Sequence, residues 1–146
     1  MTIEAIELEI INEFEQFDEW LDKYNYLIEL GKSLPLISDE YKTDQYVITG
    51  CQSRVWLHAS LLNGKIFFEA DSDAIITKGI VGLLVRVLTD QSPDDIINAK
   101  LDFVDTIGLR EHLSPTRSNG LTSMIKQMKF YALAFKTKIS QNPSNL

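Results

Sequence analysis

One residue of this chain has a side chain whose chemistry stands out, the single cysteine, Cys51. It lies in a Gly-Cys-Gln-Ser segment between two stretches rich in β-forming residues, where a polar turn is expected. Gly50 can adopt backbone angles that are closed to other residues, and it leaves room beside the thiol. Gln52 and Ser53 can donate hydrogen bonds, and Arg54 adds a positive charge. Since such neighbours favour the thiolate over the thiol, the segment predicts a nucleophile carried on a loop.

The residues alone leave a second interpretation of Cys51 open, because a lone cysteine is often a small buried hydrophobic residue. One thiol cannot form a disulfide within the chain, nor supply the thiolates of a structural zinc site or an iron–sulfur cluster. The sequence contains no nucleotide-binding or zinc-hydrolase motif. His58 lies well along the strand that follows the turn, and His112 lies near a helix end. We expect both to be surface or core residues rather than catalytic bases.

The composition is that of an ordinary globular domain. Of 146 residues, 45% are hydrophobic and 24% charged, and 14 Lys and Arg against 21 Asp and Glu leave a net charge of −7. That balance argues against a general nucleic-acid binder, which needs a basic surface. The acidic, helically patterned N-terminus differs from a targeting signal, and the longest apolar stretch is too short to span a membrane. We therefore expect a single cytoplasmic domain over residues 1–146, with no nucleic-acid or membrane partner.

The elements that must position Cys51 follow from the hydrophobic periodicity. Two amphipathic helices are expected first, one over about residues 3–17 and one from an N-cap at Asp18 to a stop at Gly31. After a loop, three short extended runs surround the cysteine, at 46–48, 54–62 and 66–68. Asn63-Gly64 between the last two is a strong signal for a two-residue hairpin turn. These runs predict a small antiparallel sheet of about three strands.

Helices are expected again after the sheet. Asp71-Ser72-Asp73 offers a cap for a long apolar helix to about residue 88, with Ile75 among its core candidates. Gly79 and Gly82 inside this helix suggest close packing on the sheet. Further helices are expected over about 93–98, over about 106–112, and from Ser118 or Asn119 onward. The order predicts an α+β fold in which several helices pack largely on one face of the sheet.

Four blocks of sequence, in order along most of the chain, together resemble the SufE family of sulfur-acceptor proteins. They are Trp20–Tyr24 with Leu30–Lys32, Gly50–Trp56, Asp71–Ala74 with Lys78-Gly79, and Leu113–Leu121. Each block is weak alone, but the block with the cysteine and the block with proline and arginine are specific together. The resemblance implies an α+β fold similar to that of IscU-type scaffolds, with the cysteine on a loop between strands.

The resemblance also implies a function. SufE-like proteins take sulfane sulfur from the persulfide of a SufS-type cysteine desulfurase, an enzyme that uses pyridoxal phosphate. They carry the sulfur as a cysteine persulfide and deliver it to an iron–sulfur scaffold complex of SufB type. On this match Cys51 is the sulfur acceptor, and the chain needs no cofactor or metal of its own. The match suggests supporting or partner-binding roles for Gly50, Gln52, Arg54, Asp73 and Arg117.

The chemistry of the residues fits this assignment, because attack by a thiolate on a sulfur–sulfur bond needs one accessible thiol and no second cysteine. Other functions remain open. The chain could serve a different cysteine desulfurase that feeds other sulfur pathways, or it could bind a desulfurase without carrying sulfur. A self-sufficient thiol hydrolase or redox enzyme is disfavoured, since a base and a second cysteine are missing. Arg117 either places a charge near the acceptor loop or a partner, or braces a loop.

Overall fold

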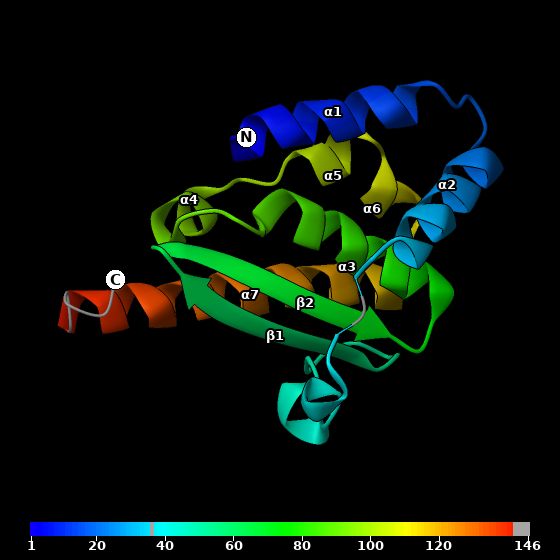
Figure 1. The fold of residues 1–146 in the computed structure, drawn as a ribbon. Coiled ribbons are helices and arrows are strands. Elements are labelled where there is room, and N and C mark those ends of the chain that lie inside the picture. Colours follow the sequence, from blue (N-terminus) through cyan, green and yellow to red (C-terminus); the bar gives the residue numbers. More distant parts are fainter. Residues whose placement is uncertain (36, 142–146) are drawn as a thin grey trace.

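The computed structural model describes residues 1–35 and 37–141, and over these the predicted α+β fold is confirmed. The elements are α1 (Ile3–Glu15), α2 (Trp20–Lys32), the 3-10 turns η1 (Asp39–Tyr41) and η2 (Asp44–Tyr46), β1 (Val55–Leu62), β2 (Lys65–Ser72), α3 (Ile75–Leu88), α4 (Pro93–Asn98), α5 (Phe103–Thr106), α6 (Leu109–His112) and α7 (Pro115–Gln141). The helices gather on one side of the β-hairpin, with α3 and α7 running along it (Figure 1).

The hairpin of β1 and β2 forms as its sequence predicts. Asn63 and Gly64 at its tip have φ angles of 53° and 78°, the positive values that a two-residue type I′ turn requires. The strands pair antiparallel without interruption as far as Val55, which lies opposite Ser72. The end of the hairpin away from the turn is therefore the end to which the loop with Cys51 is attached.

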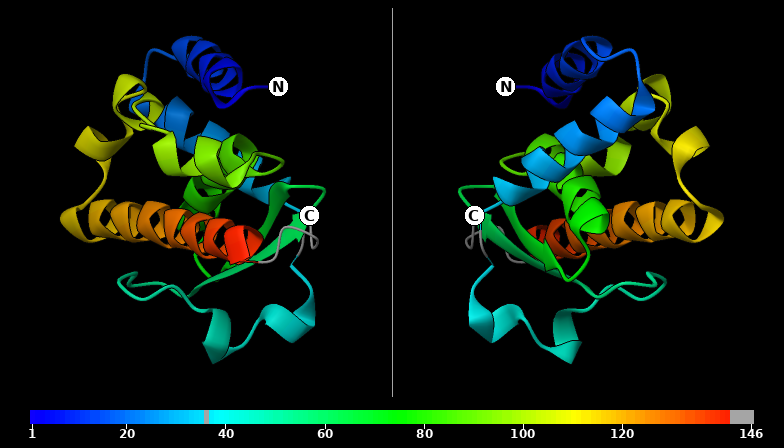
Figure 2. Two further views of the ribbon diagram at one scale, coloured as in Figure 1. Left: turned by 90° about the vertical axis from the view of Figure 1, so that its left-hand side faces the viewer. Right: turned by 90° about the vertical axis from the view of Figure 1, so that its right-hand side faces the viewer.

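The predicted third strand at 46–48 is wrong, and the described sheet has two strands. Tyr46 ends the 3-10 turn η2, Val47 makes a single bridge to Trp56, and the Ile48 N–H donates to the Val55 carbonyl at 2.8 Å. Pairing stops after this point because the chain turns away into the loop that carries the cysteine. The segment with η1 and η2 lies instead on the side of the hairpin away from the helices (Figure 2).

Glycines bring α2 and α3 into backbone contact. The prediction had placed Gly79 and Gly82 against the sheet instead. A methyl group on Gly79 would overlap the carbonyl oxygen of Leu27, and one on Gly31 would stand 2.9 Å from the Gly79 nitrogen. Gly31 thus lies within α2, which continues to Lys32, and does not end the helix. Gly82 faces more open space, because a methyl group added there would meet no described atom outside its own helix nearer than 3.9 Å. Of these two glycines in α3, only Gly79 is required by the contact with α2.

The long helix α7 begins at Pro115, about one turn before the predicted start at 118 or 119. The Ser114 hydroxyl accepts a hydrogen bond from the Arg117 N–H at 3.3 Å. A serine cap followed by proline is the same pattern that correctly predicted α4, where Ser92 is the N-cap. Because of the earlier start, both Arg117 and Gly120 are helical residues near the beginning of α7.

Two other helix starts differ from the prediction. Glu19 rather than Asp18 occupies the N-cap position of α2, and its side chain makes no capping hydrogen bond. Asp71 and Ser72 belong to β2, so Ala74 precedes α3, and that helix starts without a side-chain cap. The uncapped start of α3 matters below, because its first turn forms a wall of the functional site.

Two smaller expectations also need correction. The helix expected over 106–112 is divided into α5 and α6 by Gly108, whose φ of 79° is left-handed and suits glycine. Ile75, expected in the core, is 65% exposed at the start of α3.

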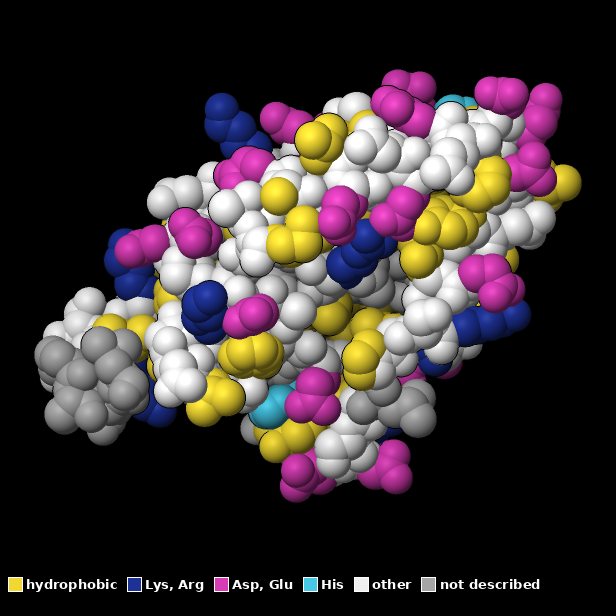
Figure 3. All heavy atoms as spheres, turned by 45° about the horizontal axis from the view of Figure 1, so that its top comes forward, with side chains coloured by type: hydrophobic (Ala, Val, Ile, Leu, Met, Phe, Trp, Pro, Cys, Tyr) yellow, Lys and Arg dark blue, Asp and Glu magenta, His cyan; other side chains and the backbone are white. Residues whose placement is uncertain are grey.

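The surface around α1 carries many acidic side chains (Figure 3). The exposed acids of this helix and of the turn after it are Glu4, Glu9, Glu15, Asp18 and Glu19. In the described part of the chain, no helix is both long and apolar enough to cross a membrane.

We expect Gly79→Ala to lower the free energy of unfolding by about 1–3 kcal/mol, because its methyl group would overlap the backbone of Leu27. Gly82→Ala in the same helix is the matched control. Its methyl group has room, so the gain in helix propensity should raise the free energy of unfolding by up to about 1 kcal/mol. Chemical denaturation of the two variants measures both changes, and changes of equal sign would contradict the backbone contact between α2 and α3.

Candidate functional site

The loop with Cys51 lies directly against α7. Gly50 has a φ of 101°, and a methyl group on it would overlap the hydroxyl of Ser123 in α7. Side chains other than glycine rarely adopt this φ, so the position requires glycine for its backbone angles and for its close approach. The prediction that Gly50 adopts a conformation closed to other residues is therefore confirmed.

The other end of the loop is fixed by Asp73 and Ser72. The Asp73 carboxylate accepts the Arg54 N–H at 3.1 Å, and the Asp73 N–H donates to the Arg54 carbonyl at 3.3 Å. The Ser72 hydroxyl donates to the same carbonyl at 2.8 Å. These bonds continue the pairing of the hairpin beyond β1 and β2. Asp73 thus holds the loop backbone at Arg54 with both its carboxylate and its N–H, and it does not line the cavity beside the thiol.

The side chain of Arg54 lies elsewhere than predicted. Its guanidinium is 3.3 Å from the carboxylate of Asp44 in η2, and Arg54 does not line the cavity beside Cys51. The chain bends at Gln52 and Ser53, so Arg54 is a neighbour of Cys51 in sequence but its side chain points elsewhere. The expectation that Arg54 supplies positive charge to the thiol is wrong for this conformation.

The thiol of Cys51 is half-buried and donates a hydrogen bond to the carbonyl oxygen of Gly120, over a distance of 3.6 Å from Sγ. Gly120 lies directly against the sulfur, and a methyl group there would stand 3.5 Å from Sγ, an ordinary contact distance. Burial raises the pKa of the Cys51 thiol above its ordinary value. The predicted preference for the thiolate is thus contradicted, because burial disfavours the charged form and the carbonyl accepts the proton of the thiol.

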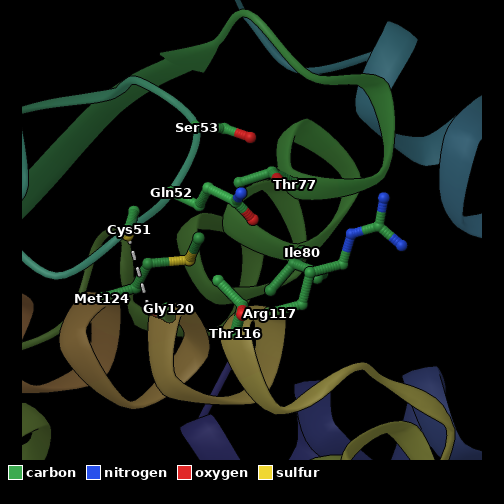
Figure 4. A pocket seen from close by; sticks show the side chains of 9 residues that line it. All are labelled: Cys51, Gln52, Ser53, Thr77, Ile80, Thr116, Arg117, Gly120 and Met124. Carbon is green, nitrogen blue, oxygen red and sulfur yellow. Dashed lines mark hydrogen bonds between the residues drawn. The ribbon is translucent and has the colours of Figure 1, made fainter.

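A cavity of about 70 Å³ opens beside the thiol (Figure 4). Three segments line it: Cys51, Gln52 and Ser53 from the loop, Thr77 and Ile80 from α3, and Thr116, Arg117, Gly120 and Met124 from α7. The Gln52 amide points into the middle of the cavity, and the Arg117 guanidinium lies at the end away from Cys51. Of the residues singled out in the sequence, Cys51, Gln52 and Arg117 meet here, Gly50 lies beside them, and Arg54 and Asp73 do not line the cavity.

Several residues of the cavity carried no signal in the sequence. Thr77 and Ile80 fit the pattern of an apolar helix, and Met124 fits the apolar face of α7. Gly120 lies in one of the four resemblance blocks, but nothing in its spacing indicates contact with Cys51. These contacts join segments far apart in the chain, so they depend on how the helices pack.

Neither histidine faces this cavity. His58 stacks on Tyr41 with ring centroids 3.5 Å apart, on the side of the hairpin that carries η1. His112 stacks on Trp20 at 3.9 Å. Among residues 1–35 and 37–141, no three His, Cys, Asp or Glu side chains cluster in a way that could hold a metal ion.

Comparison with known proteins gives a family for this fold and site. The family model for SufE, described as an Fe-S metabolism associated domain, matches residues 8–132. The chain belongs to the SufE family. Its membership links it to iron–sulfur metabolism.

Relatives of this SufE protein agree with the assignment. An uncharacterized SufE-like protein of Rhizobium meliloti (strain 1021) is 40% identical over 83% of this chain and 90% of its own length. SufE-like protein 1, chloroplastic/mitochondrial, of Arabidopsis thaliana is 36% identical over 94% of this chain, which spans 37% of that longer protein. The solution structure of a hypothetical protein from Thermus thermophilus has a TM-score of 0.75 and 21% identity over 90% of this chain and 96% of its own. That likeness supports the fold.

We predict that Cys51 of this SufE protein titrates at a higher pH in the folded chain than in the chain unfolded in urea, because burial raises its pKa. The ultraviolet absorbance of the thiolate measures the titration. Subtracting the Cys51→Ser variant under the same conditions removes the contribution of the tyrosines. A folded midpoint at or below the unfolded one would contradict the buried, protonated thiol.

We also predict that Gly50→Ala exposes the thiol. Alanine at this φ costs about 1–2 kcal/mol, and its methyl group would overlap Ser123, so alkylation of Cys51 by iodoacetamide should become about tenfold faster. Gly64→Ala is the matched control, because Gly64 also has a positive φ but lies at the hairpin tip with nothing nearby. Equal acceleration in both variants would indicate general destabilisation and contradict a local effect on the loop.

Proposed function

We propose that this protein is a sulfur carrier, which accepts sulfane sulfur on Cys51 and holds it as a cysteine persulfide. The donor is the active-site persulfide of a SufS-type cysteine desulfurase, which uses pyridoxal phosphate, and the receiver is an iron–sulfur scaffold complex of SufB type. The observation that carries the proposal is the position of the only cysteine, next to Gly50 on a loop beside a cavity, in a chain of the SufE family.

The transfer itself needs no metal, cofactor or second cysteine from this chain. Cys51 gives up its proton, and the thiolate attacks the outer sulfur of the desulfurase persulfide. A new sulfur–sulfur bond forms on Cys51 as the original one breaks, and the desulfurase cysteine leaves as a thiolate. The number of sulfur–sulfur bonds is unchanged, so the step requires no external oxidant or reductant. Delivery to the scaffold repeats the exchange with Cys51 as the leaving group.

The geometry of the resting site adds a condition to this scheme. Half-buried against Gly120 and with a raised pKa, the Cys51 thiol is poorly placed to attack a sulfur held in another protein. The loop must therefore move away from α7 before transfer. Its fixed points at Arg54 and Asp73 lie on the hairpin side, so the part that moves is the short stretch around Gly50 and Cys51.

The proposal predicts that incubation with a SufS-type desulfurase and free cysteine adds the mass of sulfur to the wild-type chain and adds none to Cys51→Ser. Intact-protein mass spectrometry measures the addition, and treatment with a reductant should remove it. The rate of the desulfurase is recorded in the same reactions. We expect the wild type to stimulate the enzyme and Cys51→Ser to lose this stimulation, because no thiol is present to take the sulfur.

Two outcomes of this experiment would overturn the carrier function. Sulfur additions that persist in Cys51→Ser would place the acceptor elsewhere. Stimulation that survives in Cys51→Ser without sulfur additions would make the chain a non-catalytic binding module. Repeating the reactions with desulfurases of different types identifies which one is the partner.

A further inference from the structure

The first turn of α3 contributes Thr77 to the wall of the cavity beside Cys51, and this turn has unsatisfied hydrogen-bond donors. Ala74 occupies the N-cap position without a side-chain hydrogen bond, and the first backbone bond runs from the Lys78 N–H to the Ala74 carbonyl at 2.8 Å. In the described residues, the N–H groups of residues 75–77 therefore have no acceptor. Such a helix start carries a partial positive charge and readily binds an anion.

A buried hydroxyl group points to a ligand in the same place. Thr77 lies in the first turn of α3, is only 7% exposed and lines the cavity (Figure 4). Within residues 1–35 and 37–141, the fully enclosed side-chain polar atoms without a hydrogen-bond partner are Trp56 Nε1 and His58 Nδ1, so the Thr77 hydroxyl, which has no protein partner, opens onto the cavity. A narrow cavity has room for few waters, and a polar ligand there can take their place on this hydroxyl.

The opposite wall adds a positive charge. Arg117 lines the cavity, and its guanidinium has no carboxylate within ion-pair distance among residues 1–35 and 37–141. The other three arginines, Arg54, Arg86 and Arg110, are each paired with an acidic side chain at 3.3, 2.6 and 3.3 Å. In a chain with a net charge of −7, a guanidinium left without a carboxylate beside a cavity is a suitable anion receptor.

We propose that the cavity beside Cys51 is a binding site for a small oxoanion. The hydroxyl and N–H of Thr77 and the guanidinium of Arg117 hold its oxygen atoms, and the rest of the molecule faces Sγ of Cys51. At about 70 Å³ the cavity admits only a small anionic group. Two sources share this chemistry: a sulfur oxyanion, or the carboxylate of a low-molecular-weight thiol or persulfide.

This site deepens the proposed function without depending on a desulfurase. It would make Cys51 select anionic sulfur compounds over neutral ones among the small molecules that reach it. The two proposed ligands, Thr77 and Arg117, lie on α3 and α7, and the loop closes the third side of the cavity with Gln52 and Ser53.

Alkylation of Cys51 with iodoacetate and iodoacetamide tests the site, because the first reagent carries a carboxylate and the second a neutral amide in its place. The ratio of their rates, divided by the same ratio for the urea-unfolded chain, cancels changes in the exposure of the thiol. We expect the folded wild type to prefer iodoacetate relative to the unfolded chain. Thr77→Val and Arg117→Gln should each lower this preference about fivefold, as the loss of one hydrogen bond predicts.

The control variant is Lys126→Gln, which removes the same charge as Arg117→Gln from an exposed position on α7 outside the cavity. It should leave the preference unchanged. A wild-type ratio at or below that of the unfolded chain would overturn the proposal. So would equal losses in Thr77→Val and Lys126→Gln, since the effect would then be general to the protein surface.

Competition separates the two sources of anion. Sodium sulfate and sodium formate are added at constant ionic strength, balanced with chloride, and the rate with iodoacetate is measured. Slowing by sulfate alone assigns the site to sulfur oxyanions, and slowing by formate alone assigns it to carboxylates. Slowing by both supports the shared chemistry, and slowing by neither overturns the site. Because no desulfurase is present, these results stand or fall separately from persulfide loading.

Discussion

The contact between the Cys51 loop and α7 is the interaction on which the site depends. A side chain at Gly50 would overlap Ser123, so the loop can lie on the helix only with glycine at this position. The half-buried thiol, its raised pKa and the cavity beside it all follow from this contact, because each exists only while the loop rests on α7.

The hairpin supplies the second support of the loop, and it does so through local bonds. The pairing of β1 and β2 continues past their ends through Arg54, Asp73 and Ser72, so the position where the loop meets the sheet is fixed by the same ladder as the strands. The start of α3 follows directly after this point. The geometry of the cavity is thus tied to the register of the hairpin on one wall and to the packing of α7 on the other.

Local chemistry made much of this arrangement predictable from sequence. Asn63-Gly64 specified the hairpin, Ser92 before proline specified α4, and the Gly-Cys-Gln-Ser segment specified a loop with a special glycine, because each signal acts within a few residues. The same cap pattern was present at Ser114 and would have given the start of α7. What could not be predicted depends on tertiary packing. Gly79 contacts α2 and not the sheet, Arg54 turns toward Asp44, and Arg117 reaches the cavity from a distant helix.

For the proposed sulfur carrier, a thiol that is protonated at rest is an advantage. Burial raises the pKa of Cys51 and so favours the unreactive thiol. Movement of the loop away from α7 exposes the sulfur and removes the burial that raised its pKa, so accessibility and ionisation change together. A partner that binds the open loop would therefore create the nucleophile only where a persulfide is available. The single cysteine of the sequence adds to this control, because a persulfide on Cys51 would find no second thiol among the 146 residues that could discharge it as a disulfide.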